Sequence, residues 1–414
     1  MVCAQCHSFR DIFVPGYAAG EDYYDYFLPI LEFDQPVAKY PAYWPDGRTR
    51  RFSSDALGLW QSQCFLKGGA TCTMCHADAH DTGIEMNAAV KPAATAICGR
   101  CHAAEVKTAA AHSHHAEGSA GTRCVECHMP RTVQSVKAEI RDHSMSIPAP
   151  ENTAKHQIPN ACNFCHKDRT AGWAVAKVKE WYGAGKGEAR RQQAVRRADT
   201  FVAARKGDAT VVGALAEMAG DATENPLNRA NAVGYLSRFG GSAAAYPAME
   251  RALGDASPLV RAVAALRMNA AGEARAKAAM ALTQRLGDTS AVVRLAAAVN
   301  LTGMGIKTLP GVDGERLEAA RMLYRQRAEL NVDDAAQQMS VGRFFLLLND
   351  PARAAEALAL SLRIDPMTPA QYFLGYAYVS QRKYAEAREV LGKIGQADAQ
   401  YGKAQELLKA IAGR

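Results

Sequence analysis

The sequence predicts a mainly α-helical protein with two dissimilar parts: a loop-rich first part and a second part built as a stack of helical hairpins. Two observations lead to this prediction. All 11 cysteines and all 11 histidines lie before residue 167, among short polar loops. The rest of the chain is rich in Ala and Leu and repeats itself at about 33 residues, which is typical of helical-repeat proteins.

Five copies of the pattern Cys-x-x-Cys-His lie in the first part. This pattern is the attachment signature of a c-type haem, in which the thiols become thioethers and the histidine becomes the proximal ligand of the iron. Cysteines three residues apart on one helical turn project from the same side. We therefore predict five covalent haems. The attachment residues are Cys3, Cys6, Cys72, Cys75, Cys98, Cys101, Cys124, Cys127, Cys162 and Cys165, and the proximal ligands are His7, His76, His102, His128 and His166.

Zinc is the alternative for Cys-x-x-Cys pairs, which also build zinc ribbons and knuckles. Zinc does not need a histidine directly behind every second cysteine, so the five repeats favour haem. The eleventh cysteine, Cys64, is interpreted as a small buried residue or a free thiol, with a sulfur ligand to a haem as the other reading.

Distal ligands are expected from the histidines outside the motifs, because a low-spin electron-transfer haem usually takes a second histidine. Five haems need five such ligands and the chain has six: His80, His112, His114, His115, His143 and His156. One of the crowded trio at 112–115 is the expected spare. His80 follows His76 by four residues and cannot easily reach the far side of the same ring, so we expect it to serve a neighbouring haem.

Further residues among the motifs each have two readings. Asp142 either orients the imidazole of His143 or is solvated, and Met145 is an alternative axial ligand. Six tyrosines either pack on porphyrin faces or include a catalytic one: Tyr17, Tyr23, Tyr24, Tyr26, Tyr40 and Tyr43. Seven arginines either bind haem propionates or are solvated: Arg10, Arg48, Arg50, Arg51, Arg100, Arg131 and Arg141.

The second part of the chain carries internal repeats. Arg229, Arg261 and Arg294 recur in similar segments and resemble HEAT-type helical hairpins. In each segment we expect an aspartate at the helix N-cap, namely Asp221, Asp255 and Asp288. Two tetratricopeptide (TPR) units follow, marked by Gly342, Phe345, Ala354, Leu358 and Pro366 and by Leu374, Gly375, Tyr378, Ala387 and Leu391. The predicted domains are 1–170 with the haems, 171–206 as a basic helical linker, 207–305 as HEAT-like repeats and 306–414 as TPR-like repeats.

Charge and hydropathy set the expected surroundings. The formal charge is +7, and five ferric haems at roughly −1 each would lower it to about +2, so we expect no nucleic-acid partner. No run of about 18 apolar residues suggests a transmembrane helix. Haem attachment through thioethers takes place outside the cytoplasm in bacteria, so we expect a periplasmic or otherwise extracytoplasmic protein. No secretory signal peptide precedes Cys3, which favours a fragment whose front end is missing.

The segments GATCTMCHADAH, RCVECHMP, RDHSMSIPAP and IPNACNFCHKDR, followed by HEAT-like and TPR-like repeats, resemble the bacterial multihaem c-type cytochromes of the cytochrome c-554-like class with a TPR tail. The resemblance implies export, redox work and the five proximal ligands named above, and it implies further haem motifs upstream of Cys3.

Two functions follow from these expectations. The first is electron transfer through five haems, with the helical-repeat tail docking a redox partner protein. The alternative is an oxidoreductase that acts on small nitrogen or sulfur oxyanions at a five-coordinate haem. The absence of a Cys-x-x-Cys-Lys motif and the surplus of distal histidines favour the first, so whether the chain is an enzyme stays open, leaning to no.

Overall fold

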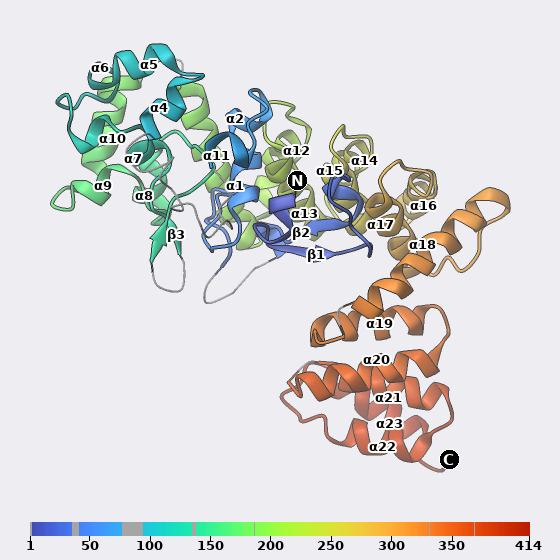
Figure 1. Cartoon of the computed structure of the whole chain (residues 1–414). Coiled ribbons are helices and arrows are strands. Elements are labelled where there is room, and N and C mark those ends of the chain that lie inside the picture. The colour runs from blue at the N-terminus through green and yellow to red at the C-terminus, as the bar shows by residue number, and fades with distance from the viewer. Residues whose placement is uncertain are drawn as a thin grey trace, which may run out of the picture. The chain divides into compact units, whose positions relative to one another are not determined.

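The computed structural model describes residues 2–34, 41–76, 94–134, 138–185, 187–330, 332–367 and 369–414. It is mainly α-helical, as predicted (Figure 1). In the described ranges the strands form two small sheets, β1 (Arg10–Ile12) with β2 (Phe27–Pro29) and β3 (Val133–Gln134) antiparallel to β4 (Glu139–Ile140).

The chain forms two compact units. Unit 1 comprises residues 1–11, 19–23 and 28–271, and unit 2 comprises residues 12–18, 24–27 and 272–414. The sequence places its boundaries near residues 170, 206 and 305. This four-part division stays a prediction.

Short helices separated by loops make up the first 166 residues. None of the α-helices described there exceeds seven residues, so backbone turns and side-chain contacts do much of the positioning. They are α1 (Asp55–Gln61), α2 (Gln63–Leu66), α3 (Cys72–Cys75), α4 (Ala94–Gly99), α5 (Ala103–Lys107), α6 (Ala109–Ser113), α7 (Cys124–His128), α8 (Pro150–His156) and α9 (Cys162–Cys165). Single 3-10 turns add η1 (Val2–Gln5), η2 (Tyr23–Asp25), η3 (Glu32–Asp34) and η4 (Ala120–Thr122).

Longer helices begin with α10 (Ala171–Tyr182) and α11 (Glu188–Arg205). The basic helix α11 buries one face, including Phe201. Its arginines on that side are bound to carboxylates. Arg191 contacts Glu151 and Glu188, Arg197 Nη1 lies 2.7 Å from Glu224, and Arg205 contacts the buried Glu32. The basic run is therefore part of the core of unit 1.

Helical hairpins follow, in which α12 packs against α13, α14 against α15 and α16 against α17. Their bounds are α12 (Val212–Gly220), α13 (Pro226–Leu236), α14 (Ala245–Ala252), α15 (Pro258–Arg267), α16 (Glu273–Arg285) and α17 (Ala291–Gly303), with η5 (Ala209–Val211) and η6 (Ser237–Phe239) between them.

The repeated arginines make repeated contacts. Arg261 Nη1 donates to the carbonyl of Asp255 at 2.9 Å, and Arg294 Nη1 donates to that of Asp288 at 2.8 Å. Within unit 1, Arg229 also binds both carboxylate oxygens of Asp255. The arginine thus fastens the start of its own helix to the turn before it.

The expected aspartate N-caps are wrong. The N-cap residues are instead Asn225, Ser257 and Ser290. Each aspartate lies earlier, in the turn before the helix, where its carboxylate accepts the amide N–H two residues on: Asp221 from Thr223, Asp255 from Ser257 and Asp288 from Ser290. Aspartate favours such local turns for the same reason that it favours caps, since its short side chain reaches a nearby amide.

The last helices of unit 2 are α18 (Gly311–Leu330), α19 (Ala335–Leu347), α20 (Pro351–Ile364), α21 (Gln371–Ser380), α22 (Tyr384–Gly392) and α23 (Tyr401–Ala410), of which α19 to α22 form two successive hairpins (Figure 1). Each hairpin contains the same close contact between its two helices. A Cβ at Gly342 would lie 2.4 Å from Leu358, and a Cβ at Gly375 would lie 2.4 Å from Leu391. The equivalent residues are 33 apart, so the hairpins repeat in packing as well as in sequence.

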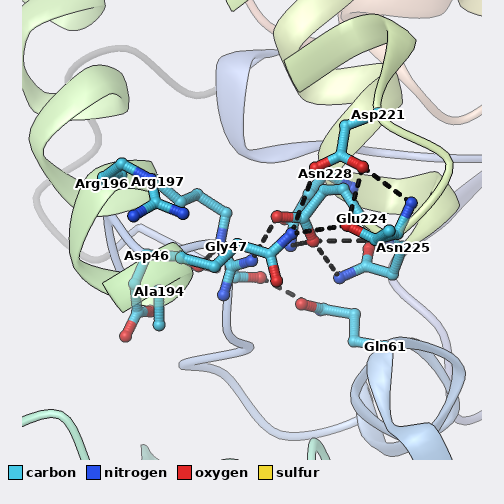
Figure 2. Close-up of polar contacts among 12 residues, drawn as sticks. Asp46, Gly47, Gln61, Ala194, Arg196, Arg197, Asp221, Glu224, Asn225 and Asn228 are labelled. Carbon is cyan, nitrogen blue, oxygen red and sulfur yellow. Dashed lines mark hydrogen bonds and ion pairs between the residues drawn. The ribbon is translucent and has the colours of Figure 1, made fainter. Parts of the chain in front are cut away.

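Within unit 1, the chain before α1 packs on α13. The hydroxyl of Tyr235 donates to the buried carboxylate of Glu32 at 2.6 Å, and Asn231 accepts the amide N–H of Phe33 at 3.1 Å. Figure 2 shows a second set of contacts, in which Arg197 of α11 donates to the carbonyl of Asp46 and pairs with Glu224. These contacts hold the loop at 41–54 against α11 and the turn before α13.

Candidate haem sites

The five Cys-x-x-Cys-His motifs adopt one local geometry. In four of them the amide N–H of the histidine donates to the carbonyl of the first cysteine at 2.8–3.0 Å, for His7, His76, His102 and His166. In the fifth, residues 124–128 form α7 itself. Each motif is thus a single helical turn that places both thiols on one side, as thioether attachment requires.

Thiols of successive motifs lie close enough to affect one another. Burial raises the pKa of the Cys98 thiol to about 11, and Cys124 of the next motif adds to this rise. Burial also raises the pKa of Cys127 to about 11, with Cys162 and Cys165 contributing. Cys72 is affected in the same way by Cys3. Cys101 of the third motif also raises the pKa of Cys75 in the second, so the motifs neighbour each other in chain order within unit 1.

Three motif histidines are each faced by a histidine from outside the motifs. The ring centroids are 6.1 Å apart for His76 and His143, 6.3 Å for His128 and His112, and 6.1 Å for His166 and His115. These separations are too long for rings in face-to-face contact. Two imidazoles bound on opposite sides of one metal lie about 6 Å apart between centroids, because each nitrogen lies about 2 Å from the metal. The three pairs therefore fit bis-histidine coordination of a metal between them.

Hydrogen bonds fix the orientation of several of these rings through Nδ1. His128 Nδ1 lies 3.0 Å from the carbonyl of Ser146, and His115 Nδ1 lies 2.6 Å from that of Ser113. His143 Nδ1 contacts the carbonyl of Arg141 at 3.1 Å and a carboxylate oxygen of Asp55 at 3.2 Å. A ring that donates its Nδ1–H has Nε2 free as a neutral ligand atom, which is the usual arrangement of metal-binding histidines.

The pKa values of the paired histidines depend on their burial and on the nearest charged group. Burial lowers the pKa of His76, and the facing His143 lowers it further. Burial likewise lowers the pKa of His128. For His143, burial alone would lower the pKa, but the hydrogen bond and charge of Asp55 raise it. A lowered pKa keeps imidazole neutral near pH 7, which is the form that binds a metal.

The other histidines have different surroundings. His114 stacks on Trp181 with ring centroids 4.7 Å apart and planes at 9°. His156 has its Nε2 2.6 Å from Asp199. His80 lies outside the described residues. In the part of the chain that the structure describes, no second histidine ring faces His7 or His102 as in the three pairs. Of the crowded trio, His114 is thus the one that faces no motif histidine.

Several predicted residues lie in unexpected contacts. Arg48 pairs with Asp46 at 2.8 Å and with Asp142 at 3.2 Å, so that Asp142 holds this arginine while its other oxygen accepts the amide of Ser144. Arg141 donates to Glu126 and to two carbonyls. These two arginines are therefore occupied by protein groups. Met145 follows His143 by two positions in the chain, and the residue that faces His76 is His143.

The tyrosines and the eleventh cysteine also have assigned places. Tyr23 and Tyr43 are buried, and their hydroxyls contact Ser8 and the carbonyl of Ile30. Tyr40 lies outside the described residues. Cys64 is half-buried, and its pKa is raised by burial and by the thiols of Cys75 and Cys101. All eleven cysteines lie within the described ranges and none forms a disulfide.

Four residues that contact the candidate ligands were not predicted from the sequence as site residues: Asp55, Trp173, Trp181 and Tyr182. Trp173 packs on His166 with centroids 4.8 Å apart, and the Tyr182 hydroxyl donates to the carbonyl of His112 at 2.6 Å. Both tryptophans and the tyrosine lie on α10, directly after the last motif. Their helical spacing was visible in the sequence, whereas nothing near Asp55 indicated its role.

Comparison of the chain with family models, with curated proteins and with solved structures finds no match.

Within the described ranges, no three His, Cys, Asp or Glu side chains converge as a protein-only metal site would. A haem iron needs only two protein ligands, because the porphyrin supplies the other four. None of the helices described combines the length and the apolar character needed to cross a bilayer.

Proposed function

We propose that the chain is a multihaem c-type cytochrome that binds five haems covalently and transfers electrons among them. The observation that carries the proposal is the set of three histidine pairs at 6.1–6.3 Å, each joining one Cys-x-x-Cys-His motif to a histidine elsewhere in unit 1. A chance arrangement of surface histidines has no reason to repeat one separation three times, each time with a motif histidine as one member.

The chain's residues would hold these groups in a defined way. The two thiols of each motif would form the covalent attachment, and the motif histidine would be one ligand of the iron. His143, His112 and His115 would be the second ligands, paired with His76, His128 and His166 respectively. When bound, each haem supplies an iron that alternates between ferric and ferrous forms and so carries one electron.

The order of the motifs supports a continuous electron path. Thiols of motifs one and two, three and four, and four and five influence each other directly, and Cys75 of the second motif is affected by Cys101 of the third. Because their attachment points lie so near one another, successive haems would also lie close together. The chain's role is then to hold a row of haems, with electrons entering at one end and leaving at the other.

An oxidoreductase acting on a small nitrogen or sulfur oxyanion is the second candidate function. It is favoured by the motifs of His7 and His102, which no described histidine faces. The remaining candidates for their distal positions are His80, outside the described residues, and His114 and His156, which are engaged by Trp181 and Asp199. A haem left with one histidine keeps an open coordination position for substrate.

The helical hairpins of unit 2 are proposed to dock a redox partner protein. Stacked hairpins present a continuous surface of the kind that helical-repeat proteins use for binding. Because haem attachment through thioethers is an extracytoplasmic process in bacteria, the proposed location is the periplasm or another extracytoplasmic compartment.

Haem stoichiometry tests the main proposal. Holoprotein matured in a bacterial periplasm is denatured, and its intact mass is measured. We expect an excess of five haem equivalents over the polypeptide. A fully matured sample with fewer than five would contradict the count, and one whose haem is removed by denaturation would contradict covalent attachment. The spin state of the native sample separates the two functions, because an open position at His7 or His102 gives high-spin iron.

A further inference from the structure

Asp55, the first residue of α1, lies between two histidines of different candidate sites. Its Oδ2 lies 2.9 Å from Nδ1 of His7, and its Oδ1 lies 3.2 Å from Nδ1 of His143. Each carboxylate oxygen therefore contacts one imidazole, and Nδ1 of His143 also lies 3.1 Å from the carbonyl of Arg141. His7 belongs to the first motif, whereas His143 faces the histidine of the second motif.

The start of α1 is shaped around these two histidines. The amide N–H of Ala56 donates to the carbonyl of His7 at 3.0 Å. One turn later, a Cβ at Gly58 would lie 3.3 Å from the backbone and Cβ of His143, so the helix approaches this residue closely. Asp55 and Gly58 are three residues apart and share one helix face. Backbone packing as well as the carboxylate thus fixes both histidines to α1.

Both contacts use the nitrogen that is not expected to bind iron. A carboxylate that accepts the Nδ1–H of a ligating histidine fixes its tautomer and ring orientation and makes Nε2 a stronger donor.

We propose that Asp55 is a positioning residue that joins the axial ligands of two haems: the proximal ligand His7 of the first and the distal ligand His143 of the second. This inference rests on the proposed function. Because one carboxylate strengthens both ligands, it favours the ferric form at both haems and links their reduction potentials. The two haems nearest the N-terminus of this chain would then behave as a coupled pair.

The test uses the full-length holoprotein and the isosteric variant Asp55→Asn. An amide accepts a hydrogen bond more weakly than a carboxylate, so both ligands become weaker donors. We expect two of the five one-electron steps to move to higher potential. At a fixed ambient potential the ferric-to-ferrous ratio of those two haems should fall by at least tenfold, which corresponds to about 59 mV. The spectrum should stay that of the unsubstituted protein in spin state.

Glu126→Gln is the matched control. Glu126 is also a half-buried carboxylate in the haem-bearing region, but its ion pairs are with Arg141 at 2.8 Å and Arg123 at 3.2 Å, and none is with a described histidine. Loss of this carboxylate should move at most one step. Gly58→Ala is a second variant, which presses on His143 and on the backbone nitrogen of Ser144 and should move only the second haem's potential.

The outcomes are distinguishable from failure of the proposed function. A holoprotein without five covalent haems contradicts the proposed function itself. Five haems together with Asp55→Asn potentials equal to those of the unsubstituted protein, or with a single shifted step, overturn the linking role and leave electron transfer intact. Should Asp55→Asn not fold, Asp55→Glu replaces it, because the longer side chain moves the carboxylate away from both histidines, and an Asp55→Glu holoprotein with fewer than two shifted steps overturns the linking role.

Discussion

Arg48 is the residue whose removal should most disturb the loop that carries His143. Its side chain is largely buried and donates to Asp46 Oδ2 at 2.8 Å, to Asp142 Oδ2 at 3.2 Å and to the carbonyl of Pro159 at 3.3 Å. The Asp142 side chain is 0% exposed, so water cannot replace the lost arginine. In Arg48→Met the carboxylate of Asp142 would keep one hydrogen bond, from the amide of Ser144.

The expected loss of stability follows because Arg48→Met leaves the buried carboxylate of Asp142 without its cationic partner. Removing one partner of a buried ion pair costs about 3–5 kcal/mol, and compact domains are stable by only about 5–15 kcal/mol. We therefore expect Arg48→Met to lower the free energy of unfolding of unit 1 by about 3–5 kcal/mol in urea denaturation of the holoprotein. Because Asp142 precedes His143, the haem bound by His76 should lose its low-spin signal first as urea is raised.

Two variants control for the loss of an arginine. Arg190 is exposed and bonds only weakly to Gln63 at 3.4 Å, so Arg190→Met should change stability by less than about 0.5 kcal/mol. The double variant Arg48→Met with Asp142→Asn removes the stranded charge and should recover part of the loss. A cost below about 1 kcal/mol for Arg48→Met, or no recovery in the double variant, would refute the reasoning.

Three further predictions concern ligands, packing and pH. His115→Ala should convert one haem to high spin by electron paramagnetic resonance, whereas His114→Ala should convert none; identical spectra for the two would contradict the pairing. Gly342→Ala should lower the stability of unit 2 by about 1–3 kcal/mol in urea denaturation because its Cβ meets Leu358, whereas Gly402→Ala, with no atom within 4 Å, should lose nothing. Burial raises the pKa of Tyr235, and the charge of Glu32 raises it further. Tyr235 therefore ionises at a lower pH in the unfolded chain than in the folded one. Its contribution to the free energy of unfolding is complete below about pH 10 and is lost as the pH rises further. Denaturation between pH 9 and 11.5 would measure this loss.

The local geometry of the motifs could be predicted from the sequence because it depends on residues within one helical turn. The identity of each facing histidine could not be predicted in this way. His143 is 67 residues from His76, and its position depends on the Arg48–Asp142 pair and on the close approach of Gly58. The spare histidine of the trio likewise depends on Trp181, which belongs to a helix outside the motifs.

The limits of the compact units depend on contacts that no local pattern reveals. The change in composition near residue 170 is real, but Glu32 and Phe33 bind α13 residues about 200 positions later in the chain. A buried carboxylate and its tyrosine partner carry no shared signature in the sequence. By contrast, the 33-residue repeat was visible early, because the same side chains recur in each hairpin.

The positions of the iron atoms test the central claim most directly. Anomalous diffraction at the iron edge from crystals of the holoprotein locates each iron without reference to the chain. We predict five irons, of which three lie midway between His76 and His143, between His128 and His112, and between His166 and His115. Fewer than five irons, or three irons that are not between these pairs, would contradict the account.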